Sequence, residues 1–172
     1  MKTLYLLRHA KAAPESSLGD ARRPLAKRGR KAAKTMAEFL STLAPAPELV
    51  LCSTSVRTRE TLDLILPALN PPPTVLYEDG LYLASAAELI ERLRKVRNET
   101  SCVLVIGHNP GLHELAGRLA SDPGRLAEGF PTGALAVLQV PGAWVDLQWQ
   151  EAKLVLYETP KELTRDSDPE AD

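Results

Sequence analysis

The chain has 172 residues, of which 44% are hydrophobic and 25% charged, and its formal net charge is −1. These values are typical of one globular domain, and they argue against bulk electrostatic attraction to nucleic acid or to a membrane surface. No apolar run approaches the ~20 residues that span a bilayer, and the strand-like N-terminus leaves no room for a signal peptide. We therefore expect a cytoplasmic protein, with one domain over residues 1–160 and an acidic, disordered tail over residues 161–172.

The first predicted strand covers residues 3–7, where large apolar side chains follow one another with little alternation. Such a run is typical of a strand buried on both faces of a sheet. Arg8 and His9 follow it directly. Because ligands bind at the carboxyl ends of strands in open α/β folds, this places a cation and a nucleophile at the mouth of a site. Ordinary loop chemistry is the alternative interpretation.

A basic helix is predicted next, over residues 26–43, from apolar residues at helical spacing. Two interpretations of its basic start stay open. The cations form either a solvated helix face or a collar that attracts an anionic substrate. They are Arg22, Arg23, Lys27, Arg28, Arg30, Lys31 and Lys34.

The second buried strand, residues 49–52, ends at Ser53-Thr54-Ser55, which is good N-cap sequence. The helix behind it, with apolar residues up to Leu69, places Arg57 in its first turn. A helix N-terminus with free backbone donors and an arginine is a natural site for an anion.

A third strand is predicted over residues 74–77, and Ser85 with Glu88 forms a capping box for the following helix. The continuous apolar strand 102–106 then ends at Gly107 and His108.

His108 thus follows a strand end, as His9 does. We expect Asn109 to be the N-cap of the next helix and Pro110 its first residue. His113, inside that helix, is expected to be structural or exposed.

The last part of the chain predicts strands over residues 134–140, 144–149 and 153–157, with short antiparallel connections. Cys52 and Cys102 both fall in apolar runs without metal-type spacing. We expect reduced core thiols, although the sequence leaves a bridge between them open.

Two histidines and two arginines at three strand ends suit phosphoryl transfer. Guanidinium groups match phosphoryl oxygens in bidentate fashion, and their charge favours neutral imidazole, the nucleophilic form. His9 would attack phosphorus, and His108 would help to neutralise the equatorial oxygens. We expect no cofactor and no metal, since there is no acidic cluster to hold a metal ion.

The same residues resemble those of the histidine phosphatase superfamily, which has the phosphoglycerate-mutase-like fold, and in particular its SixA-type phosphohistidine phosphatase branch. The resemblance covers the chain from Met1 to about Tyr157. It rests on LLRHAKA, Ser53-x-x-x-Arg57-x-x-x-Thr61, Asp20-x-x-Arg23-Pro24-Leu25, Gly29, Gly107-His108-Asn109-Pro110-Gly111 and Pro131-Thr132-Gly133-Ala134.

The resemblance implies an α/β fold, a three-layer α/β/α sandwich whose sheet is mainly parallel with an antiparallel edge. It implies that His9 is phosphorylated and that Arg8, Arg57 and His108 hold the phosphate; Arg23 is a further candidate ligand.

Two departures from the family concern the residue after the nucleophile and the general acid. Ala10 replaces the usual glycine, and Leu83 and Asn109 stand where branches of the family have an acid. The general acid is therefore unknown. Asp20, Glu78 and Asp79 are possible substitutes, or else simple surface carboxylates.

The missing acid favours a substrate with a good leaving group. Imidazole leaves phosphohistidine more readily than an alkoxide leaves a phosphate ester, so the sequence predicts a phosphatase for phosphohistidine in proteins. The alternatives are a phosphatase for small phosphate compounds and a non-catalytic module that binds phosphate or phosphopeptides.

Overall fold

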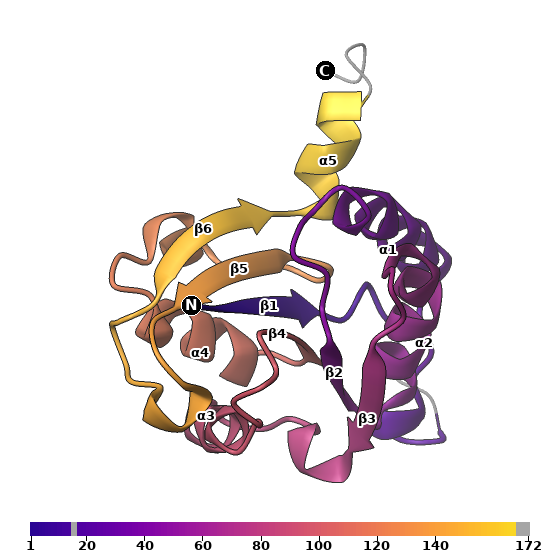
Figure 1. Ribbon diagram of the computed structural model, residues 1–172. Coiled ribbons are helices and arrows are strands. Elements are labelled where there is room, and N and C mark those ends of the chain that lie inside the picture. The colour runs from indigo at the N-terminus through magenta and orange to yellow at the C-terminus, as the bar shows by residue number, and fades with distance from the viewer. Residues whose placement is uncertain (15–16, 168–172) are drawn as a thin grey trace.

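The computed structural model describes residues 1–14 and 17–167. Among these, six strands form one sheet in the order β3-β2-β4-β1-β5-β6 (Figure 1). Neighbouring strands from β3 to β1 are parallel, whereas β5 pairs antiparallel with both β1 and β6. This confirms the predicted sheet, mainly parallel with an antiparallel edge. The strands are β1 (Lys2–Arg8), β2 (Leu49–Ser53), β3 (Thr74–Glu78), β4 (Cys102–Gly107), β5 (Leu135–Val140) and β6 (Lys153–Glu158).

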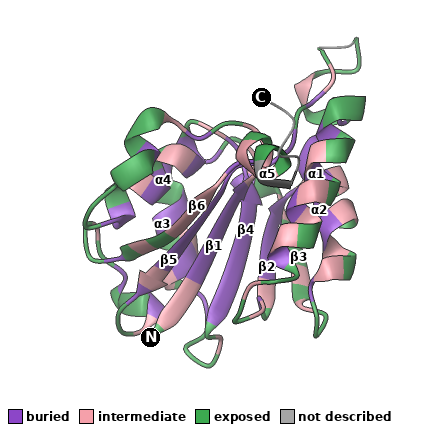
Figure 2. Cartoon of the chain, turned by 90° about the horizontal axis from the view of Figure 1, so that it is seen from above, coloured by how far each residue is buried: buried purple, intermediate pink, exposed green. Residues whose placement is uncertain are grey.

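Helices cover both faces of the sheet and make the three predicted layers (Figure 2). On β1, Leu4 and Leu6 pack in the core on one face, while Tyr5 and Leu7 pack in the core on the other. All four side chains are buried, which explains why this strand shows no alternation in its sequence. One face carries α1 (Lys27–Leu40) and α2 (Val56–Ile65), and the opposite face carries α3 (Ala86–Arg94) and α4 (Gly111–Leu119).

Two of the three predicted helix caps are present. The Ser55 side chain accepts a hydrogen bond from the Thr58 amide at the start of α2, and Ser85 with Glu88 forms the capping box of α3. The prediction for Asn109 is wrong. Its side-chain amide donates instead to the Phe130 carbonyl, 2.8 Å away, and α4 begins only at Gly111.

The strand predicted over residues 144–149 is also wrong. Residues Trp144–Asp146 form a 3₁₀ helix, and the indole nitrogen of Trp144 donates to the Thr100 carbonyl. Trp144 and Leu147 are both buried while Val145 is exposed. In a 3₁₀ turn, buried residues recur every three positions. In so short a segment, this pattern is hard to distinguish from the alternation of a strand.

Two helices are shorter than predicted, and one helix was missed. α1 ends at Leu40, and α2 ends at Ile65, followed by the 3₁₀ turn Leu66–Ala68. The prediction of a disordered tail is wrong up to residue 167, because Pro160–Ser167 forms helix α5. The remainder of the predicted tail, residues 168–172, lies outside the described residues. The single-domain assignment stays a prediction.

Cys52 on β2 and Cys102 on β4 are free and fully buried, as expected for core thiols. Burial raises the pKa of each thiol to about 12, so both stay protonated at neutral pH. In the described part of the chain, no helix combines the length and apolar character needed to cross a membrane.

Two glycines let helices pack directly against backbone near the sheet's carboxyl edge. A Cβ at Gly29 in α1 would lie 2.0 Å from the Lys11 carbonyl oxygen, and one at Gly111 in α4 would lie 1.8 Å from that of Ala84. Real Cβ contacts are never so short. Both positions therefore require glycine for close approach.

Candidate active site

The predicted site residues meet at the carboxyl edge of three adjacent strands. Arg8 ends β1 and His9 follows it, His108 follows β4, and Arg57 lies in the first turn of α2 behind β2. Because β4 pairs with both β1 and β2, the three strand ends are neighbours. The topology therefore gathers residues from three distant segments of the sequence.

Arg57 joins the two histidines. Its Nε donates to His9 Nε2 and its Nη2 to His108 Nδ1, each over 3.3 Å. The centroids of the two imidazole rings are 5.4 Å apart. All three side chains are buried, with at most 7% of any residue exposed.

The hydrogen bonds determine which nitrogen of each histidine carries a proton. His9 Nδ1 lies 2.7 Å from the Ala10 carbonyl, which can only accept, so Nδ1 is protonated and Nε2 presents its lone pair. The guanidinium of Arg57 can only donate, so His108 Nδ1 is unprotonated. His108 Nε2 then donates to the hydroxyl of Ser53, 2.8 Å away.

Both imidazoles are neutral at neutral pH. Burial, the largest cause, and the nearby arginine charges together lower the pKa of His9 to about 4, against the opposing hydrogen bond to Ala10. Burial likewise lowers the pKa of His108 to about 3, with a contribution from His9. His9 Nε2 is thus in the nucleophilic form over the whole physiological range.

Asp20 reaches the cluster from a 3₁₀ turn, Asp20–Arg22, in the connection between β1 and α1. Its carboxylate accepts from Arg57 Nη2 and Arg23 Nη1, each over 3.0 Å, and from the Tyr82 hydroxyl. The Asp20 carbonyl accepts from Arg57 Nη1 at 2.8 Å. Hydrogen bonds from Tyr82 and the arginines hold the pKa of Asp20 well below its usual range, so Asp20 is ionised.

The other two predicted cations lie at the margin of this cluster. Arg8 Nη1 donates to the Phe130 carbonyl at 3.2 Å, and its buried Nε has no hydrogen-bond partner among the described residues. Burial and the charge of Arg57 lower the pKa of Arg8. Arg23 donates to Asp20 and to the Ala13 carbonyl, so its role as a phosphate ligand stays a prediction.

Three further residues support the cluster: Ser53 and Thr61, which the sequence motif around Arg57 named without a role, and Tyr82, which the sequence did not single out. The hydroxyl of Thr61 accepts from the Ala10 amide at 3.1 Å and donates to the Arg57 carbonyl at 2.7 Å. Thr61 lies four residues after Arg57, and this motif spacing places both residues on the same helix face. Tyr82 packs edge-on to His108, with centroids 5.3 Å apart.

The comparisons with known proteins agree with this geometry. A family model for the histidine phosphatase superfamily (branch 1) matches residues 4–81. The solved structure of a candidate phosphohistidine phosphatase SixA from Nakamurella multipartitia is 35% identical, with a TM-score of 0.81. The match covers 92% of this chain and 96% of that one. The chain belongs to the histidine phosphatase superfamily.

Further relatives place it in the SixA-type branch of that superfamily. The protein histidine phosphatase SixA, solved in complex with tungstate, is 26% identical, with a TM-score of 0.79 over 94% of this chain and 99% of that one. An uncharacterized protein of Mycobacterium tuberculosis is 37% identical over 162 residues, which cover 90% of this chain and 100% of that protein.

The possible acids of this histidine phosphatase are already engaged. Glu78 pairs with Arg92 through two hydrogen bonds of 2.7 and 2.9 Å, and Asp79 accepts from the Thr54 hydroxyl at 2.7 Å. Ionised Asp20 has no proton to give. The general acid therefore stays unassigned. Within residues 1–14 and 17–167, no group of three His, Cys, Asp or Glu side chains is placed to hold a metal ion.

Proposed function

We propose that this histidine phosphatase hydrolyses phosphohistidine in proteins through a covalent intermediate on His9. The observation that supports this most directly is the orientation of the His9 ring. With Nδ1 committed to the Ala10 carbonyl, the lone pair of Nε2 faces the Arg57 guanidinium. A phosphoryl group bound by Arg57 would thus lie next to an unprotonated nucleophile.

The first step transfers the phosphoryl group to the protein. His9 Nε2 attacks phosphorus while the P–N bond to the substrate imidazole breaks, and the departing nitrogen takes a proton from solvent. Water then attacks the phosphorus of phospho-His9, breaks the second P–N bond and releases orthophosphate. Neutral His9 is restored.

Arg8, Arg57 and His108 would stabilise the transferred group. The two guanidiniums supply fixed positive charge around the equatorial oxygens, which is the usual main term in phosphoryl transfer. A bound dianion would also raise the pKa of His108 and allow it to donate from Nδ1. The proposal includes no metal ion, because the arginines supply the charge that a metal would provide. Activity should therefore survive a chelator.

The engagement of Asp20, Glu78 and Asp79 supports the choice of substrate. Asp20 is ionised, and Glu78 and Asp79 are held by Arg92 and Thr54, whereas a phosphate ester that releases an alkoxide needs a proton donor. Imidazole is a better leaving group that solvent can protonate. The SixA relative solved with tungstate, a tetrahedral oxyanion like phosphate, is consistent with an oxyanion site in this branch.

A rapid-quench trap tests the intermediate. Wild type, His9→Ala and the control His113→Ala are mixed with labelled phosphoramidate, and acid-labile, base-stable phosphate is mapped to residues. His113 is the matched control because it binds the Leu126 carbonyl away from the cluster. We expect label at His9 in wild type and in His113→Ala, and none in His9→Ala.

The substrate is tested separately on a phosphohistidine peptide and a panel of small phosphate esters. Preference for the peptide supports the proposal. Rapid turnover of one metabolite with none of the peptide would favour a small-molecule phosphatase, and binding without turnover would favour a phosphate-binding module.

A further inference from the structure

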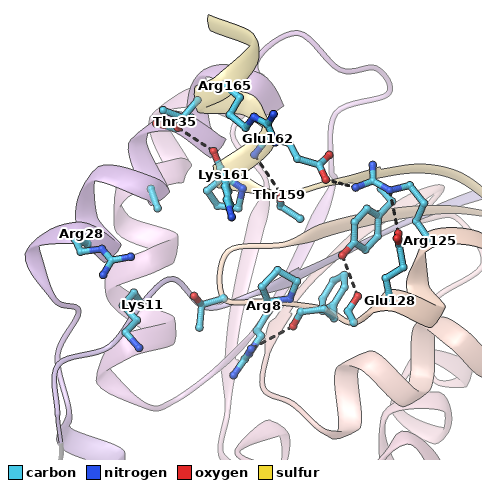
Figure 3. Close-up of a pocket in the computed structure, with 18 of the residues that line it drawn as sticks. Arg8, Lys11, Arg28, Thr35, Arg125, Glu128, Thr159, Lys161, Glu162 and Arg165 are labelled. Atoms are coloured by element: carbon cyan, nitrogen blue, oxygen red, sulfur yellow. Dashed lines mark hydrogen bonds and ion pairs between the residues drawn. The ribbon is translucent and has the colours of Figure 1, made fainter. Parts of the chain in front are cut away.

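A basic groove opens beside the site. It has a volume of about 1340 Å³ and runs between α1, α5 and the loop that precedes β5. Seven cationic and two acidic side chains line it, although the whole chain has a net charge of −1. In Figure 3, Arg8 lies at its lower end, with Lys11 and Arg28 to the left and Lys161 above.

The acids in the groove do not neutralise most of its cations. Glu128 and Glu162 both pair with Arg125. Lys11, Arg28, Lys31 and Lys161 are exposed and form no ion pair with any carboxylate of the described residues. Positive charge on α1, on α5 and on the segment after β1 is thus available to a ligand.

The groove is continuous with the candidate active site. Arg8 and Asn109, which line it, immediately precede His9 and follow His108. A ligand in the groove would therefore present its end to the residues proposed to hold phosphate. The face of α1 from Arg28 to Thr35 covers about 10 Å, the length of about three extended residues.

The aromatic side chains in the groove argue against single-stranded nucleic acid. The Arg125 guanidinium lies over the Tyr157 ring, 4.7 Å from its centroid, and the Phe130 ring is buried and stacks with His113. Phe130 is thus withdrawn from solvent and the Tyr157 ring already carries a guanidinium, whereas base stacking on open rings is a main source of affinity for single strands. The other residues that line the groove suit the backbone and carboxylate groups of a peptide.

We propose that this groove binds an acidic segment of the substrate protein next to its phosphohistidine. The inference rests on the proposed function for the identity of the substrate. Lys31 and Arg28 on α1 and Lys161 on α5 would pair with Asp or Glu side chains a few residues from the phosphorylated histidine. The groove would then select among phosphoproteins by charge, while His9 and its neighbours act on the phosphoryl group.

The first experiment measures binding without phosphorylation. Two fluorescein-labelled peptides of twelve residues with a central histidine are compared by fluorescence anisotropy; one has Asp and Glu flanks, the other Asn and Gln. We expect wild type to bind the acidic peptide about tenfold more tightly, since a few ion pairs contribute this much. Equal affinity for both peptides would overturn the inference.

A matched pair of double variants locates the binding surface. Arg28→Glu with Lys31→Glu reverses two charges in the groove, and Lys27→Glu with Lys34→Glu reverses two on the same helix outside it. The groove variant should lose the preference for the acidic peptide and the control should keep it. Equal loss in both would show that only the overall charge matters.

Two further measurements keep the outcomes distinct. Lys161→Glu, on a different helix, should weaken acidic-peptide binding on its own, and thermal unfolding verifies the fold of each variant. If single-stranded RNA of equal length binds more tightly than the acidic peptide, and the groove variant loses this RNA binding, the groove is a nucleic-acid site and the inference is wrong.

Phosphorylated forms of both peptides separate this inference from the proposed function. No turnover of either phosphopeptide, with selective binding intact, would refute the proposed function alone. Equal kcat/KM for both, with no selective binding, would refute the groove alone.

Discussion

Asp20→Asn tests whether a carboxylate of the protein occupies the position of the substrate phosphate. In the structure Arg57 uses four of its five N–H donors: it donates to His9, to His108, and to the carbonyl and carboxylate of Asp20. A phosphate that binds Arg57 must displace the Asp20 carboxylate or tolerate a second anion beside it. The amide in Asp20→Asn keeps the shape and removes the charge.

The magnitude follows from the contact that phosphate must break. A buried hydrogen bond between charged groups contributes about 1.5–3 kcal/mol. The Asp20 side chain is 35% exposed, so solvent screening reduces this to about 1 kcal/mol. We expect orthophosphate and tungstate to bind Asp20→Asn about fivefold more tightly than wild type.

Isothermal titration calorimetry at constant ionic strength measures both affinities. Asp63→Asn is the control, because Asp63 lies on α2 like Arg57, is exposed, and its replacement changes the net charge equally. An unchanged or weaker affinity in Asp20→Asn, or an equal gain in Asp63→Asn, would refute the view that Asp20 competes with phosphate.

Three other predictions concern the cluster. Arg57→Ala should lower kcat/KM by about 2.7–4 kcal/mol of transition-state stabilisation, and a near-normal value in steady-state assays would remove Arg57 from the site. Ser53→Ala leaves the His108 Nε2 proton without its acceptor and should lower the free energy of unfolding by about 1–3 kcal/mol; urea denaturation that matches wild type would contradict the assigned tautomer. Burial lowers the pKa of His9 to about 4 and that of His108 to about 3, so below pH 6.5 the unfolded chain binds protons that the folded chain excludes. The contribution of these histidines to stability is complete above pH 6.5, decreases as the pH falls below 6.5, and is fully lost once the pH has fallen through the folded-state values. Urea denaturation at pH 7 and pH 4.5 should therefore show a lower free energy of unfolding at pH 4.5.

The sheet could be predicted from the sequence because its strands are continuous apolar runs ended by turn residues. Residues 102–106 are buried on both faces, so neither face imposes a polar pattern. The segment from Trp144 to Trp149 was misassigned because a 3₁₀ turn and an alternating strand have similar patterns of apolar and polar residues over so short a segment. α5 was missed because its composition is polar, and its position beside α1 depends on the tertiary structure.

The positions of the candidate site residues were predictable for a similar reason. His9, Arg57 and His108 each follow a strand, and parallel strands bring their carboxyl ends to one edge. The contacts of Asp20 and Tyr82 were not predictable, because both residues lie in irregular turns whose positions depend on the folded chain. Likewise, the tautomers depend on single backbone acceptors such as the Ala10 carbonyl, which the residue type does not reveal.

The glycine contact in α1 has a consequence for how the site responds to ligands. Because Gly29 has no side chain, the helix backbone packs directly against the Lys11 carbonyl. That same oxygen accepts a hydrogen bond from the Ala26 amide at 2.9 Å. The first turn of α1 and the segment after His9 are therefore joined backbone to backbone, without a compressible side chain between them. Any ligand that displaces α1 by a fraction of an ångström displaces Lys11 with it. Since Lys11 is two residues from His9, the distance from nucleophile to phosphorus would respond to what lies along the helix.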